Sequence, residues 1–107
     1  MNKNKFFELK AEICKALGHP LRIEIIDLLK NHEMCFSDIL NKTGGLKSNL
    51  SQHLSILTKI RILKMRREGK CNHYSISSQK TLQIYNAIHE LLIEDIKKQS
   101  NLLKATN

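Results

Sequence analysis

The segment from residue 47 to residue 59 combines a leucine stripe with an opposite face of uncharged hydrogen-bonding side chains. Leu50, Leu54 and Leu57 recur at spacings of four and three, which places them on one side of a helix. The other side carries Ser48, Ser51, Gln52, Ser55 and Lys59, and it is flanked near the helix start by Lys47, Asn49 and His53. Amides can pair with adenine, hydroxyls with phosphates or base edges, and cations with phosphates or guanine. We predict a helix that points into a DNA major groove; the alternative is an ordinary solvated face, for which Ser and Asn are mediocre helix formers.

The charge distribution also favours a polyanionic partner. The formal net charge is +8, and no Asp or Glu occurs between residues 39 and 67. The same stretch holds seven cations, namely Lys42, Lys47, Lys59, Arg61, Lys64, Arg66 and Arg67. A block of this kind within a periodic, foldable segment is typical of nucleic-acid binding, with a solubilising surface as the alternative.

Hydrophobic periodicity and turn residues predict the elements that position this helix within one domain of residues 1–107. The predicted order is four helices, a β-hairpin and a long last helix. Their expected ranges are 4–17, 20–30, 37–43 and 47–59 for the first four helices, 62–76 for the hairpin and 79–100 for the last helix. Gly44-Gly45 separates the third and fourth helices, which is the arrangement of a helix-turn-helix. The fold class is therefore mainly α with a small β-hairpin.

The hairpin is expected to form a second contact surface. Its turn lies near Glu68-Gly69 and carries Arg66, Arg67 and Lys70. A basic hairpin that follows a recognition helix can reach phosphates or a neighbouring minor groove. The alternative is a simple basic turn.

Three motifs make the chain resemble the ArsR/SmtB family of small winged helix-turn-helix repressors. They are "ALGHPLR", "SNLSQHLSIL" and "REGKCNHYSI". The sequence departs from the family pattern at Leu46, where Ser is more usual, and at Gln52, where Arg or Lys is common; both bear on base preference. The resemblance implies a homodimer paired through the first and last helices, about residues 4–17 and 79–100, on an inverted-repeat operator. The corresponding apolar residues are Phe6, Leu9, Ile13, Leu82, Tyr85, Ile88 and Leu92.

Members of this family often release DNA on metal binding or thiol chemistry, which implies a sensor site of one of a few known types. The Asp-x-His pattern at the start of the last helix is absent, and Ser37 replaces the second cysteine of a Cys-x-Cys that begins at Cys35. No metal site or cofactor is predicted. Cys14 is expected in the core, because free cysteines are often buried. Cys35 and Cys71 are a candidate redox, persulfide or soft-metal sensor that repositions the wing, because the segment before the third helix can pair with the hairpin. The alternative is that Cys35 simply packs in the short apolar run before that helix.

Several other classes are disfavoured. The N-terminus lacks an apolar signal core, and no apolar run approaches the ~20 residues of a membrane span, which predicts a cytoplasmic protein without membrane partners. Three widely spaced cysteines fit a reducing compartment. No phosphate loop, paired catalytic carboxylates or nucleophile–base arrangement suggests an enzyme. The sequence thus predicts a homodimeric repressor released by a metal ion or a thiol-reactive inducer; the alternative is a basic nucleic-acid-binding module without an inducer site.

Overall fold

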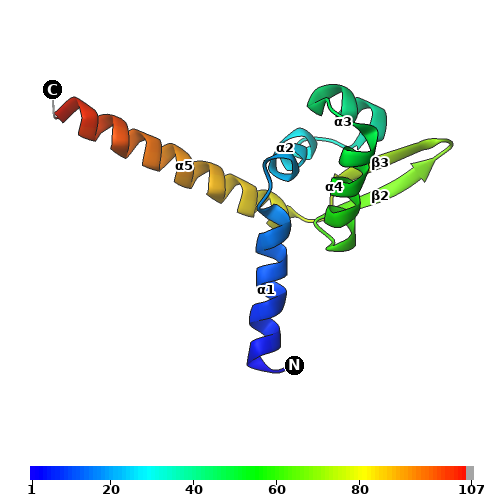
Figure 1. Ribbon diagram of the computed structural model, residues 1–107, viewed down its shortest axis with the longest axis horizontal. Coiled ribbons are helices and arrows are strands. Elements are labelled where there is room, and N and C mark those ends of the chain that lie inside the picture. The colour runs from blue at the N-terminus through cyan, green and yellow to red at the C-terminus, as the bar shows by residue number, and fades with distance from the viewer. Residues whose placement is uncertain (106–107) are drawn as a thin grey trace.

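The computed structural model describes residues 1–105, in which three helices and a small sheet form a central body and the first and last helices project from it (Figure 1). The elements are α1 (Lys3–Leu17), α2 (Pro20–Leu29), β1 (Met34–Cys35), α3 (Phe36–Thr43), α4 (Lys47–Lys59), β2 (Leu63–Glu68), β3 (Cys71–Ile76) and α5 (Gln79–Ala105). Helices α1 and α5 leave the central body in different directions. The predicted winged helix-turn-helix architecture is confirmed.

Local chemistry explains where the first two helices begin and end. The side chain of Asn2 caps α1 by accepting a hydrogen bond from the Lys5 amide at 2.8 Å. Pro20 occupies the first turn of α2, where its missing N–H costs nothing. His19 caps the same helix, because its Nδ1 accepts from the Leu21 amide at 3.2 Å.

The boundaries agree with the prediction to within one residue except at the end of α5, and the start of α3 has a cause outside the helix itself. Helix α3 begins at Phe36 with Cys35 as its N-cap residue, so Ser37, the predicted start of this helix, lies inside the first turn. The cause is tertiary, since Met34 and Cys35 are used as an extra strand. Helix α5 continues to Ala105 instead of ending near residue 100.

The sheet is antiparallel, with the strand order β1-β3-β2. Met34 pairs with Tyr74, and Cys35 pairs with His73. On the other side of β3, Arg66 also lies opposite His73. Because side chains alternate across a strand, Leu63 and Tyr74 face the helices while Arg66 and His73 face outward.

The hydrophobic core joins α4 to the other elements of the central body. Buried side chains come from α1, α2, β1, α3, α4 and both wing strands; they include Ile25, Ile26, Leu29, Ile39, Leu50, Leu54 and Leu57. The predicted leucine stripe of α4 is therefore its buried side. None of the helices within the described range 1–105 is long and apolar enough to cross a membrane.

Leu54→Ala should destabilise the protein by about 3 kcal/mol, because Leu54 has 0% exposure and its truncation leaves a cavity between α4 and its neighbours. Urea unfolding followed by circular dichroism measures the change. The exposed helical position Ser55→Ala is the control and should shift the free energy of unfolding by less than about 0.5 kcal/mol. Equal stability of Leu54→Ala and wild type would contradict the observed packing of α4.

Candidate nucleic-acid interface

The outward side of α4 is a continuous exposed surface of small polar side chains. Ser48, Ser51, Gln52, Ser55, Ile56 and Lys59 line one shallow hollow on this side. Lys47 and Asn49 are also exposed at the helix start. The structure thus brings together the predicted contact residues of α4, with one exception.

The exception is His53, which points into the protein and not toward solvent. Its exposure is 8%, comparable with that of the core residues. Its Nδ1 accepts a hydrogen bond from Arg22 Nε at 3.0 Å, and its ring lies 4.4 Å from the ring of His19. The prediction that His53 belongs to the contact face was wrong, because position 53 lies on the same side of the helix as Leu50, Leu54 and Leu57.

Leu46 is a surface residue of this region that the sequence prediction did not include. It is the N-cap residue of α4, makes no side-chain cap and is 73% exposed. An exposed apolar side chain beside a reading helix can contact a thymine methyl group. The signal was present in the sequence as a leucine where a capping serine is expected.

The wing is the hairpin of β2, β3 and the turn between them. Its predicted cations differ in their hydrogen-bond partners. Arg67 and Lys70 are exposed near the hairpin tip, and Arg67 Nη1 donates to Asn72 Oδ1 at 3.2 Å. Arg66 instead donates to Glu33 through two nitrogens and to Glu68 Oε2 at 2.7 Å. Arg66, predicted as a free phosphate ligand, is therefore largely neutralised within the chain.

The same ion pairs link the wing to the loop before β1. Hydrogen bonds from Arg66 hold the pKa of the Glu33 and Glu68 carboxyls below their ordinary value. His73 lies between them, with its two nitrogens each 4.0 Å from one of the carboxylates. All of these groups are exposed to some degree, so water screens the interaction. The arrangement orients the wing more than it stabilises the fold.

Known proteins with this geometry are regulators. The family model described as "Bacterial regulatory protein, arsR family" matches residues 19–65. The uncharacterized HTH-type transcriptional regulator MJ1325 of Methanocaldococcus jannaschii is 38% identical over 86 residues, which cover 79% of this chain and 97% of that protein. The chain belongs to the ArsR/SmtB family of transcriptional regulators.

Two further relatives extend the comparison to structure and to repression. The solution structure of the homodimeric winged helix-turn-helix DNA-binding domain Mb0332 from Mycobacterium bovis superposes with a TM-score of 0.81 at 26% identity, over 87% of this chain and 86% of that one. The Transcriptional repressor SmtB homolog of Synechocystis is 30% identical over 84 residues, covering 78% of this chain and 64% of that protein. The ArsR-family fold of this chain is thus supported by sequence and by shape.

In this ArsR-family chain, α1 and α5 expose apolar side chains over most of their length. Exposed members of the predicted set are Phe6, Ile13, Ile88 and Leu92, at 53%, 42%, 42% and 55%. Leu9 and Leu82 are partly buried. The distal half of α5 adds Leu91, Ile93, Ile96, Leu102 and Leu103. Apolar surface of this extent on two projecting helices is typical of a protein–protein interface.

Tyr85, predicted at the dimer interface, has a role within its own chain. Its hydroxyl donates to Asp27 Oδ1 at 2.5 Å and so connects α5 to α2. This bond lowers the pKa of the Asp27 carboxyl and raises the pKa of the Tyr85 hydroxyl. Tyr85 also packs against the core.

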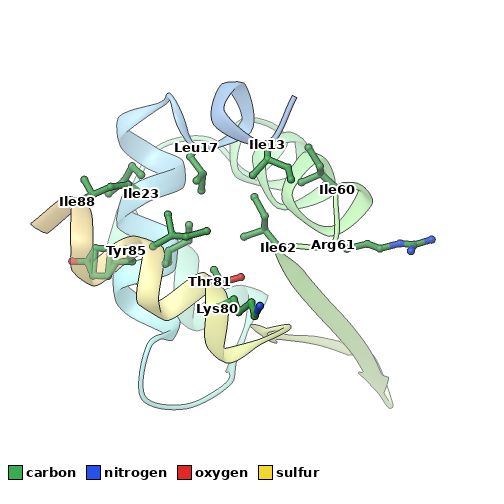
Figure 2. Close-up of a pocket in the computed structure, with 12 residues that line it drawn as sticks. Ile13, Leu17, Ile23, Ile60, Arg61, Ile62, Lys80, Thr81, Tyr85 and Ile88 are labelled. Atoms are coloured by element: carbon green, nitrogen blue, oxygen red, sulfur yellow. The ribbon is translucent and has the colours of Figure 1, made fainter. Parts of the chain in front are cut away.

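A cavity of about 150 Å³ lies where α1, α2 and α5 meet. Figure 2 shows apolar side chains converging on it from these helices, while Arg61 points away. Ile13 and Ile88 belong both to its lining and to the exposed faces of α1 and α5. A single chain therefore leaves the junction of its two projecting helices incompletely filled.

The cysteines are distributed differently from the prediction. Cys14 is exposed, so its expected place in the core was wrong. Cys35 is partly buried, with its Sγ 3.2 Å from Ser37 Oγ, and Cys71 is exposed. Cys35 lies opposite His73, two residues along β3 from Cys71, so both thiols belong to the outward face of the sheet. Within residues 1–105, no three His, Cys, Asp or Glu side chains gather closely enough to hold a metal ion.

Proposed function

We propose that this ArsR-family regulator is a homodimeric repressor that inserts α4 of each subunit into the DNA major groove. The observation that carries the proposal is the exposed face of α4, where serines, amides and lysines stand without a carboxylate. Base edges offer donors and acceptors that such side chains can match, and the cations suit the flanking phosphates.

The apolar faces of α1 and α5 support dimerisation. Within residues 1–104, no buried cluster covers the exposed apolar side chains of these two helices. The relative Mb0332 is described as homodimeric, and a two-fold dimer presents two reading helices. Such a dimer prefers an inverted repeat with half-sites about one helical turn apart.

In this proposal the dimer represses transcription by occupying its operator, because a dimer bound across a promoter excludes RNA polymerase. The relative from Synechocystis carries the name of a transcriptional repressor. Selection of bound duplexes from a random pool, with the purified protein in about 0.2 M salt, tests the proposal. Enrichment of an inverted repeat is the expected result. Recovery of unrelated sequences with equal affinity would instead support the non-specific basic module.

Arg67→Gln should lower the dependence of DNA affinity on salt more than Arg66→Gln does. Arg67 carries an exposed charge with no carboxylate partner among the described side chains, whereas Glu33 and Glu68 neutralise Arg66. Each phosphate contact contributes about 0.9 to the slope of log affinity against log salt, so loss in both subunits should reduce the slope by about 2. Fluorescence anisotropy at four salt concentrations measures it. An equal or larger change for Arg66→Gln would show that Arg66 leaves its carboxylates to bind DNA.

We further propose that a thiol-reactive inducer acts at Cys35 and Cys71. Diagonal residues on neighbouring strands lie roughly 7–8 Å apart, which exceeds the usual disulfide separation. Oxidation of the two thiols to one disulfide, with loss of two protons and two electrons to the oxidant, would therefore pull β1 toward the wing tip. Such a shift moves the wing relative to α4.

Operator binding before and after treatment with diamide tests this inducer proposal. Wild type should release DNA and regain binding with dithiothreitol, whereas Cys35→Ser and Cys71→Ser should each stay bound. Cys14→Ser is the control and should behave as wild type. Release by the Cys35→Ser, Cys71→Ser double variant would overturn the proposal without affecting the DNA-binding one.

A further inference from the structure

We infer that His53 is a positioning residue, whose neutral imidazole fixes the reading helix α4 to α1 and α2 through Arg22 and releases it when protonated. The inference rests on the proposed DNA-binding function, because α4 is taken as the helix that enters the groove. It assigns to the histidine a role inside the protein instead of a contact with DNA.

The geometry joins three helices at one guanidinium group. Arg22 of α2 donates from Nε to His53 Nδ1 of α4 at 3.0 Å. The same side chain donates from Nη1 to the carbonyl oxygen of Ala16 in α1 at 3.3 Å. His19, which caps α2, contacts the other side of the junction through its ring, 4.4 Å from that of His53.

These bonds define the protonation state of His53. Arginine has only donors, so Nδ1 must accept and cannot carry a proton. Both acceptors of Arg22 are uncharged, which leaves its positive charge beside the imidazole without a carboxylate bonded to it. Burial first, and then the charges of His19 and Arg22, lower the pKa of His53 below its ordinary value of 6.5.

The position of the junction gives it a functional consequence. Helix α1 belongs to the proposed dimer interface, and α4 carries the proposed base contacts. The bridge from Ala16 through Arg22 to His53 therefore helps to set the angle between the reading helix and the dimer axis. Half-site recognition depends on that angle, because two helices must enter successive major grooves together.

Protonation of His53 would break the bridge. A proton on Nδ1 would face the Nε–H of Arg22, and the new cation would lie beside His19 as well. Of the other charged groups near Arg22, Glu12 and Lys15 of α1 and Lys59 of α4 line the adjoining hollow, so two cations oppose one carboxylate. The net charge of these three side chains is positive, so they do not compensate for the lost hydrogen bond when His53 becomes a cation.

The direction of the pH effect follows from linkage. The folded-state pKa is lowered, so the unfolded chain binds more protons between the folded pKa and 6.5. The contribution of His53 to stability is complete above 6.5 and is lost as pH falls through the folded pKa. A positive charge added elsewhere on the protein would instead strengthen binding to the polyanionic duplex. A decrease in affinity on acidification is therefore diagnostic.

The test measures affinity for the duplex selected above, at pH 7.5 and pH 5.5, together with the thermal unfolding midpoint in the absence of DNA. Wild type should lose affinity at the lower pH, by up to roughly 10-fold, the scale of one buried hydrogen bond to a charged group. His53→Asn keeps an acceptor at the δ position and does not titrate, so it should bind at pH 7.5 within about 3-fold of wild type and lose little at pH 5.5. His53→Leu removes the acceptor and should bind roughly 10-fold more weakly at both values.

His32→Asn, at an exposed position in the loop between α2 and β1, is the matched control and should keep the wild-type pH dependence. An undiminished pH dependence in His53→Asn, or wild-type affinity in His53→Leu, would overturn the inference. If no duplex is enriched, the proposed function fails, and the unfolding midpoint still decides the inference. The midpoint of wild type should then fall between pH 7.5 and pH 5.5 by more than that of His53→Asn, and equal decreases would refute the role of His53.

Discussion

A chain carrying Ser51→Glu and Gln52→Glu should fold normally and lose at least ~100-fold in DNA affinity. Both side chains are exposed and line the hollow on the outward side of α4, so the new carboxylates do not disturb the packing of the core. In the proposed complex they would enter the major groove between two rows of phosphates, where like charges at close range cost several kcal/mol. Gel shift with the selected operator measures the loss, and circular dichroism confirms the helix content.

The control for this variant must change net charge equally at another site. Gln79→Glu and Gln83→Glu are suited to this purpose, because both positions are exposed in the first turns of α5. This control should bind within about 5-fold of wild type, since its charges lie on α5 and not on the face of α4 that enters the groove, and salt screens exposed charges at a distance. Equal losses in both double variants would mean that only net charge matters, and the base-reading role of α4 would be rejected.

The leucine stripe of α4 shows why much of the fold could be predicted. Leu50, Leu54 and Leu57 recur with helical period, and burial follows from that period alone. The start of α2 was equally clear, because Pro20 and His19 act on their own helix. Where a local rule determines the structure, the prediction and the structure agree.

His53 and Arg66 show where such prediction ends. His53 was assigned to DNA as part of the recognition-helix pattern, and Arg66 as a cation of the basic hairpin. Each instead has a partner distant in the chain: Arg22 is 31 residues from His53, and Glu33 is 33 residues from Arg66. Pairings of this kind depend on the assembled fold and leave no periodic signal in the sequence.

Cys14 and Tyr85 show the same limit for the two long helices. Whether a stripe on α1 or α5 packs on its own chain or on another copy cannot be read from its period. The structure assigns Tyr85 to its own chain through Asp27 and leaves Cys14 exposed. Substitutions of exposed residues after position 90 of α5 test dimerisation more directly, since these side chains contribute least to packing within their own subunit.

Leu92→Glu combined with Ile96→Glu should yield a folded monomer with at least ~100-fold weaker operator binding. The two side chains are 55% and 51% exposed on the projecting half of α5, so the variant loses little packing within the chain (Figure 1). Two carboxylates in each apolar face would have to be buried unpaired on dimerisation, which disfavours association strongly. The monomer then binds one half-site and loses the gain from linked binding. Light scattering after size exclusion measures the mass, with the exposed position Gln83→Glu, on the opposite side of α5 from Leu92, as the control that should remain dimeric. A dimeric Leu92→Glu, Ile96→Glu variant would place the interface elsewhere, and the apolar surface of α5 would then need another partner.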